Sequence, residues 1–323
     1  MISAGSLALA GTVPTFSPQR LSSEVKTLSS DAFEVRGPAT PAEAMTVNYI
    51  VTQMRATGLQ PGGDLTDGKR SWTQAVPLLQ SDIAGTPTFS VTEKGRLLSL
   101  AQGKEIARRA PMDGSRSVDI GNVPLVFVGH GVTAPERQWD DYKGVDLHGK
   151  IAVVLINDPD FEADKGDFGG KAETYYGRWT YKYEEAARRG AIGALIVHET
   201  APASYGWATV RNSNASAMFD IVRSNPRAEH PQLEGWIQRD LAVSMLKQAG
   251  LDFGTLKKEA QTRAFRPVTL NGVTVSANFK VDSAIITSHN VVGRIVGSKY
   301  PQQSVVYSAH WDHFGIGAPD ASG

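Results

Sequence analysis

The residues best suited to chemistry stand near the end of the sequence, at residues 305–315 (VVYSAHWDHFG). There an apolar run leads into His310, Asp312 and a glycine-rich loop. On an extended backbone, residues two apart project their side chains to the same side. Imidazole and carboxylate without sulfur suit catalytic Zn²⁺ and related ions. Either both side chains touch one metal, or one ligates while Asp312 accepts a hydrogen bond from the other ring nitrogen.

The triplet alone does not establish a metal site. With seven histidines in the chain, a chance H-x-D triplet is common. The alternative is a solvated strand end whose aspartate caps the following turn. A metal site also requires at least one further ligand, and these residues nominate none.

Other catalytic chemistries find little support. Residues 144–150 begin like a phosphate-binding loop, but Ile151 follows where the Mg²⁺-binding hydroxyl belongs, and the lysine opens a strand. No G-x-S-x-G elbow exists, and we expect His130 to be a turn residue rather than a base. The absence of cysteine excludes disulfides, Cys-ligated zinc, Fe–S clusters and a thiol nucleophile.

Composition limits the partners. The 323 residues carry 33 Lys+Arg and 33 Asp+Glu, so electrostatics gives no case for binding nucleic acid or an anionic membrane. No run approaches 18 apolar residues, so no membrane span is expected. Residues 1–16 are small, apolar and uncharged, which fits either the remnant of a secretory signal or a disordered terminus. The length allows about two domains.

The clearest predicted helix follows Thr40, with Pro41 at its first position. Glu43 completes a T-x-x-E capping box, apolar residues recur at helical spacing, and Gly58 ends the run. A hairpin is predicted for residues 89–92 and 97–100, around Lys94 and Gly95.

Beyond residue 122, apolar strands alternate with helices. Short buried strands are predicted at residues 123–128, 150–156 and 191–197, with a helix at 181–189. Asp240 is expected to cap a further helix that Gly250 ends. This order predicts an α/β fold with partly parallel pairing. A strand at 273–279 and an antiparallel hairpin of 290–296 with 304–309 then lead into His310.

The chain resembles the bacterial zinc aminopeptidases of the family that also contains aminopeptidase Y, glutamate carboxypeptidase II and, without catalysis, the transferrin receptor. The matching motifs run in order through most of the sequence, and each is modest by itself. They are residues 34–37, 57–62, 71–74, 126–131, 141–142, 146–150, 181–191, 290–293 and 309–313.

The resemblance implies a zinc-exopeptidase-like mixed-sheet catalytic domain, incomplete here, at residues 17–79 and 273–323. A smaller α/β protease-associated domain interrupts it within residues 80–272, with a core at 119–266. By the same resemblance His310 corresponds to a zinc ligand, and Asp312 to the aspartate that orients it. The family site holds two zinc ions bridged by a carboxylate. Asp320, in a D-A-S-G segment close to the family's D-N-A-S-G, is either that bridge or an ordinary loop residue.

The resemblance therefore predicts the N-terminal part of a secreted or periplasmic zinc aminopeptidase that acts on peptides. The chain by itself is expected to be inactive, because the later ligands and the general-base glutamate are missing from it. Two alternatives remain open: a non-catalytic, receptor-like binding protein on the same scaffold, and a carboxypeptidase or dipeptidase specificity. The oligomeric state is not indicated.

Overall fold

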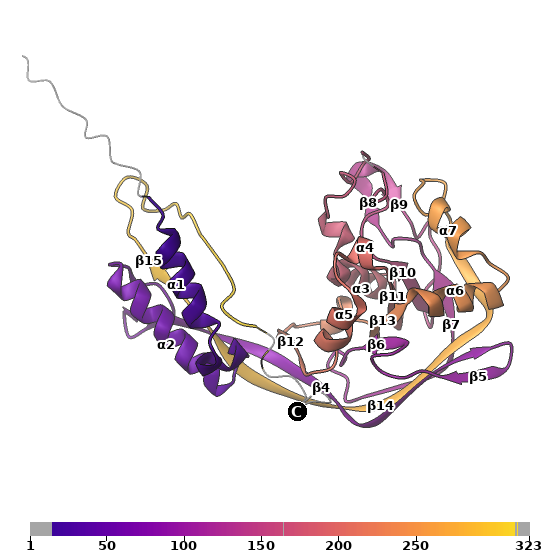
Figure 1. The fold of residues 1–323 in the computed structure, drawn as a ribbon, viewed down its shortest axis with the longest axis horizontal. Helices are drawn as coiled ribbons and strands as arrows, with labels where there is room; N and C mark the ends of the chain where they lie inside the picture. The colour runs from indigo at the N-terminus through magenta and orange to yellow at the C-terminus, as the bar shows by residue number, and fades with distance from the viewer. Residues whose placement is uncertain (1–14, 164, 314, 316–323) are drawn as a thin grey trace, which may run out of the picture. The chain divides into compact units, whose positions relative to one another are not determined.

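The computed structural model describes residues 15–163, 165–313 and 315. The chain divides into two compact units (Figure 1). The described residues of the first unit lie within Met1–Thr73 and Val291–Ile316, and those of the second within Gln74–Asn290. Most of the expected signal remnant, residues 1–14, lies outside the described residues.

The first unit consists of two helices, a 3₁₀ segment and short strand pairs. They are α1 (Pro18–Leu28), η1 (Asp31–Arg36), α2 (Pro41–Ala56), β1 (Gln60–Pro61), β2 (Leu65–Thr66), β3 (Lys69–Arg70) and β15 (Gly293–Arg294). Segments from the N-terminal and C-terminal parts of the chain join here, because β1 pairs with β15 in antiparallel fashion.

Helix α2 confirms the predicted helix but not the details of its cap. Gly58 takes a left-handed φ of 83° just beyond the last turn, as its position predicts. Thr40 has extended backbone, but its side chain makes no capping bond. The Glu43 carboxylate instead accepts the backbone N–H of Ala39, so the capping box is wrong in its partners.

The second unit is built on a mixed sheet. Its strand order is β12 (Met218–Ile221), β4 (Thr73–Glu93), β14 (Val268–Val291), β7 (Ser117–Phe127), β10 (Ile151–Leu155), β11 (Gly193–His198), β13 (Leu233–Gln238) and β6 (Ile106–Arg108), with β5 (Arg96–Ser99) paired to β4. The four strands β7, β10, β11 and β13 are parallel, as the strand–helix–strand order predicts. The pairs β12–β4, β14–β7 and β13–β6 are antiparallel, and so is the predicted β4–β5 hairpin.

Helices cover both faces of the parallel strands (Figure 1). They are α3 (Trp179–Arg188), α4 (Thr200–Ala203), α5 (Trp207–Ser213), α6 (Arg239–Gln248) and α7 (Phe253–Glu259). Short elements complete the unit: β8 (Thr133–Ala134), β9 (Trp139–Asp140), η2 (Pro135–Arg137), η3 (Tyr175–Gly177) and η4 (Pro226–Ala228).

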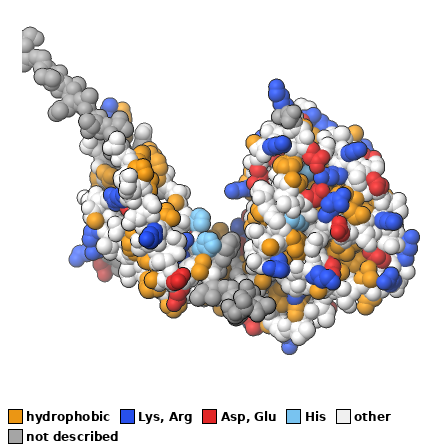
Figure 2. Space-filling model, viewed as in Figure 1, with side chains coloured by type: hydrophobic (Ala, Val, Ile, Leu, Met, Phe, Trp, Pro, Cys, Tyr) orange, Lys and Arg blue, Asp and Glu red, His pale blue; other side chains and the backbone are white. Residues whose placement is uncertain are grey.

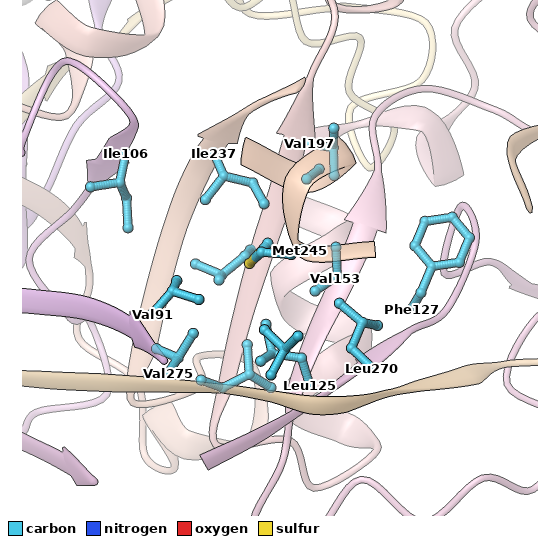
Figure 3. Packing of buried hydrophobic residues seen from close by; sticks show 14 of the residues in the cluster. Val91, Ile106, Leu125, Phe127, Val153, Val197, Ile237, Met245, Leu270 and Val275 are labelled. Atoms are coloured by element: carbon cyan, nitrogen blue, oxygen red, sulfur yellow. The ribbon is translucent and has the colours of Figure 1, made fainter. Parts of the chain in front are cut away.

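Alternation along the strands creates two cores. In β10, Val153 and Leu155 pack toward α6 and α7, whereas Ala152 and Val154 pack toward α3, α4 and α5. Figure 3 shows Met245 of α6 among the strand residues of the first core. Because both faces are covered, these strands read as continuous apolar runs. The α/β fold class with a mixed sheet is therefore confirmed.

Two further sequence predictions are wrong. The N-cap of α6 is Gln238, and Asp240 lies in the first turn, because β13 runs directly into the helix. The hairpin of residues 290–296 with 304–309 does not form: β15 pairs with β1, and residues 304–313 form no strand. Val305 and Tyr307 are 83% and 95% exposed, and an apolar run becomes a strand only beside a partner that pairs its backbone.

The surface of the second unit mixes both signs of charge. Figure 2 shows Lys and Arg side chains interspersed with Asp and Glu on the visible face, in keeping with the equal counts in the sequence. Among the described residues, no helix is both long and apolar enough to cross a membrane.

Candidate functional site

His310 and Asp312 lie together in the first unit. The Nδ1 atom of His310 is 2.9 Å from the backbone oxygen of Asp312 and 3.5 Å from its Oδ1 atom. A carbonyl oxygen only accepts, so the hydrogen-bonded nitrogen Nδ1 carries the proton in this contact. The lone pair then resides on Nε2, and the His310 side chain is 80% exposed. The hydrogen bond thus runs to the backbone of Asp312, and its carboxylate approaches the same nitrogen at 3.5 Å.

The segment that carries these residues is anchored to η1. Arg36 donates from Nε to the backbone oxygen of Trp311, at 2.9 Å. In return the backbone N–H of His313 donates to the oxygen of Arg36, at 3.0 Å, and that of Gly315 to Val35, at 3.3 Å. A segment without strand pairing is thus held on both sides of Asp312.

The anchor has an unusual backbone. Glu34, Val35 and Arg36 have positive φ values of 43°, 55° and 48°, which cost side-chain-bearing residues roughly 1–3 kcal/mol each. A Cβ atom on Gly37 would lie 3.2 Å from the Cα atom of Gly315, so a side chain at this position would be tightly packed against the second loop. Such strain persists only where surrounding contacts fix it.

The donor set at this site is incomplete. The described part of the chain contains no group of three or more His, Cys, Asp or Glu side chains arranged to hold a metal ion. Asp320, the candidate bridge, lies outside the described residues. An exposed imidazole nitrogen such as Nε2 of His310 is of a type that can bind zinc.

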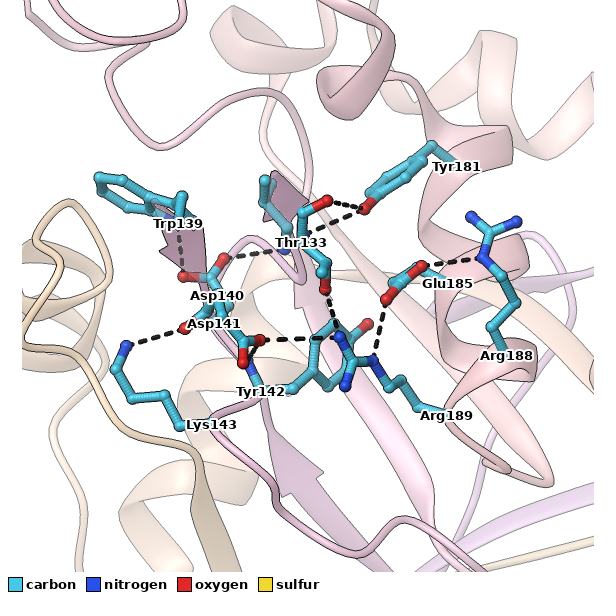
Figure 4. Close-up of polar contacts among 11 residues, drawn as sticks. Thr133, Trp139, Asp140, Asp141, Tyr142, Lys143, Tyr181, Glu185, Arg188 and Arg189 are labelled. Carbon is cyan, nitrogen blue, oxygen red and sulfur yellow. Dashed lines mark hydrogen bonds and ion pairs between the residues drawn. The ribbon is translucent and has the colours of Figure 1, made fainter. Parts of the chain in front are cut away.

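Motif residues of the second unit form a polar network instead of a reactive site (Figure 4). Arg189 donates to Glu185 at 2.9 Å and to the hydroxyl of Thr133 at 2.7 Å, and its guanidinium lies 4.9 Å from the ring centre of Tyr142. Buried Asp141 accepts the indole N–H of Trp139 and a backbone N–H, and burial raises its pKa to about 7. These contacts hold α3 against the β8–β9 segment.

His130 occupies a buried loop after β7. Its Nδ1 atom lies 3.0 Å from the backbone oxygen of Asn157, and burial, together with the charge of Lys182, lowers its pKa to about 3. The ammonium of Lys182 donates to the carbonyls of His130, Asn157 and Tyr176 at 2.7, 3.0 and 2.7 Å. A histidine that stays neutral in such a loop agrees with the expected turn role.

The sequence analysis missed a partly buried ion network around His230. Its ring nitrogens contact the carboxylates of Glu234 and Asp220 at 2.8 and 2.9 Å. Because both partners are carboxylates, both nitrogens donate and the ring is an imidazolium. Burial lowers the pKa of His230, but the two carboxylates outweigh it and raise the value to about 9. Arg109 lies 3.3 Å from Glu234, and Arg223 contacts Asp220 at 2.7 Å. Only the i, i+4 spacing of His230 and Glu234 is visible in sequence.

Comparison with known proteins gives distant structural similarity. No family model matches the chain, and no curated protein sequence matches it. Similar solved structures include an aminopeptidase from Aneurinibacillus sp. strain AM-1, with 18% identity and a TM-score of 0.40, over 85% of this chain and 47% of that one. A peptidase M28 precursor from Shewanella amazonensis has 16% identity and a TM-score of 0.39, over 91% and 57%. A zinc aminopeptidase from Bacillus subtilis has 17% identity and a TM-score of 0.31, over 86% and 46%. The chain spans about half the length of these proteins.

Proposed function

We propose that this chain is part of a zinc aminopeptidase, in which His310 binds zinc through Nε2 and Asp312 orients its ring. The observation that carries the proposal is the contact of His310 Nδ1 with Asp312, which leaves the exposed Nε2 as the coordinating atom. Metal-bound histidines typically donate their other ring N–H to a carboxylate or a carbonyl in this way. The motif similarity described above supplies the reaction class, hydrolysis of N-terminal peptide bonds.

The chemistry divides between the metal and the chain. Bound zinc polarises the scissile carbonyl and lowers the pKa of a bound water. His310 supplies a neutral nitrogen ligand, and the acceptor at Asp312 fixes its tautomer. Arg36 holds the backbone of Trp311, so that the ring of His310 starts from a defined position. In the proposal, the complete site would hold two zinc ions, with Asp320 as a further candidate ligand.

The wider organisation is part of the same proposal. Residues 17–79 and 273–323 would contribute to the catalytic domain, and residues 80–272 would contain the protease-associated insert. Two features support an insert: the motif segments 141–142 and 181–191 join in one network, and that network belongs to a compact α/β unit. This unit, Gln74–Asn290, extends beyond the proposed insert at both ends. The enzyme is proposed to be secreted or periplasmic and to act on peptides.

The test compares zinc content and hydrolysis of aminoacyl-nitroanilides for the full-length gene product and its variants. His310→Ala is expected to lose stoichiometric zinc and to lower activity by at least about 100-fold, because a ligand is removed. Asp312→Ala removes the carboxylate, whose Oδ1 atom lies 3.5 Å from Nδ1, but keeps the backbone oxygen that accepts the hydrogen bond, so we expect zinc affinity to fall by no more than about tenfold.

His148→Ala is the matched control. His148 is 83% exposed and contacts the carboxylate of Asp146 at 2.9 Å, also two residues away, but in the second unit. It is expected to leave zinc content and activity unchanged. Full activity in His310→Ala would show that the ligand assignment is wrong. A full-length protein that is metal-free and inactive would contradict the proposal that it is a zinc aminopeptidase.

A further inference from the structure

A pocket lies at the carboxyl ends of the parallel strands in the second unit. Its volume is about 750 Å³. Its lining includes His198 and Glu199 at the end of β11, and Gln238 at the end of β13. The segment after β10 adds Phe161 and Glu162. The carboxyl edge of parallel strands is where open α/β sheets bind ligands, and the volume is that of a small-molecule site.

One buried wall group has an unused acceptor. The Nε2 atom of His198 lies 2.9 Å from the backbone oxygen of Tyr205, so Nε2 carries the proton and Nδ1 the lone pair. His198 is 6% exposed, and among the described residues nothing donates to its Nδ1 atom. A buried acceptor in a pocket wall favours a ligand that brings an N–H or ammonium donor.

The charged groups of the pocket balance. Lys257 contacts Glu162 at 2.5 Å and Glu199 at 2.8 Å, and Arg239 lies 3.3 Å from Glu199. Burial opposes the charge of Lys257, but the two carboxylates outweigh it and raise its pKa. With Asp240 and Lys171 on the more exposed part of the lining, three acidic residues face three basic ones. The carboxylates repel a simple anion and the basic groups repel a simple cation, so the pocket favours neither.

Apolar surface completes the lining. The ring of Trp207 packs edge-on against His198 at 5.5 Å, and its indole N–H is already donated to the backbone oxygen of Gly103. Trp207 and Phe161 therefore offer apolar surface. We infer that this pocket binds a zwitterion of the amino-acid type, either a free amino acid or a short peptide, with its ammonium at His198 and Glu199 and its carboxylate at Arg239.

The test measures binding by calorimetry in the His310→Ala protein, so that the proposed zinc site does not contribute. L-leucine and Leu-Gly-Gly are the two probes, and the tighter one identifies a free amino acid or a peptide as the ligand. Saturable binding with a Kd below about 10 mM is expected for at least one of them. Leucinamide, without a carboxylate, and N-acetylleucine, without an ammonium, are each expected to bind at least about tenfold more weakly.

Arg239→Gln and Arg263→Gln form a matched pair. Both arginines are 51% exposed and ion-paired, but Arg263 contacts Asp167 away from the pocket. Arg239→Gln is expected to weaken binding about tenfold, and Arg263→Gln to leave it unchanged. His198→Phe tests the acceptor. It is expected to weaken binding of the tighter of the two probes, but not binding of N-acetylleucine. Equal affinity in the two arginine variants, or no binding of either probe, would overturn the inference without touching the zinc proposal.

Discussion

Replacing His230 by Gln tests the partly buried ion network of the second unit. The variant keeps an amide of similar reach but cannot carry a positive charge between Asp220 and Glu234. Glu234 is fully buried, and Arg109 at 3.3 Å would remain as its cationic partner. Loss of one partner of a buried ion pair is costly because the other charge stays buried.

The magnitude follows from the pKa of His230, which rises from 6.5 to about 9 on folding. One pKa unit corresponds to about 1.4 kcal/mol, so the protonated ring stabilises the fold by about 3 kcal/mol. A raised pKa gives stability that is complete below pH 6.5 and is lost as the pH rises to 9. In His230→Gln this part of the pH dependence is absent.

The assay is urea unfolding followed by tryptophan fluorescence at pH 6 and pH 9.5. Four of the six tryptophans, at positions 139, 179, 207 and 236, report on the second unit. We expect wild type to exceed His230→Gln in unfolding free energy at pH 6, and this gap to shrink by about 3 kcal/mol at pH 9.5. His148→Gln, an exposed control, is expected to show no such change. A gap for His230→Gln that is the same at both pH values would refute the reasoning.

Three further outcomes are expected. Lys182→Met removes an ammonium that donates hydrogen bonds to three carbonyls, so it should lower the unfolding free energy by about 3 kcal/mol. An unchanged midpoint in thermal or urea unfolding would contradict that role. Arg36→Ala should speed hydrogen exchange of the backbone N–H groups of His313 and Gly315 by about tenfold, because the bond to Trp311 that helps hold their segment is lost; unchanged exchange would show that Arg36 is no anchor. Gly63→Ala places a Cβ atom 2.1 Å from the backbone oxygen of Thr73, so circular dichroism melts should show clear destabilisation, and an unaltered melt would contradict this packing.

The sequence predicted the second unit's core well because its signals are local. Residues 151–155 and 193–198 read as buried strands from continuous apolar runs, and Gly190 and Gly250 marked the ends of helices with positive φ. The prediction failed where it depended on which strand pairs with which. Residues 304–309 have the composition of a strand, but pairing depends on which backbone lies beside them.

The candidate site shows the same division. His310 and Asp312 became candidates from their types and spacing, because on an extended backbone a two-residue separation directs both side chains to the same side. Their anchor was not identified as a contact, because Arg36 and Trp311 are separated by 275 positions in the chain. Likewise, the acceptor on His198 is known only once Tyr205 occupies the other nitrogen.

The sequence by itself determined the α/β class, the buried strands, most helix ends and the pair of polar residues suited to a metal. Periodicity, glycine positions and short spacings encode these features within a few residues. The tertiary structure alone decided the antiparallel pairing of β1 with β15, the ion network of His230 and the pocket at the carboxyl edge. These depend on which distant segments pack together, and that is settled by burial and hydrogen bonding over the whole unit rather than by any local pattern.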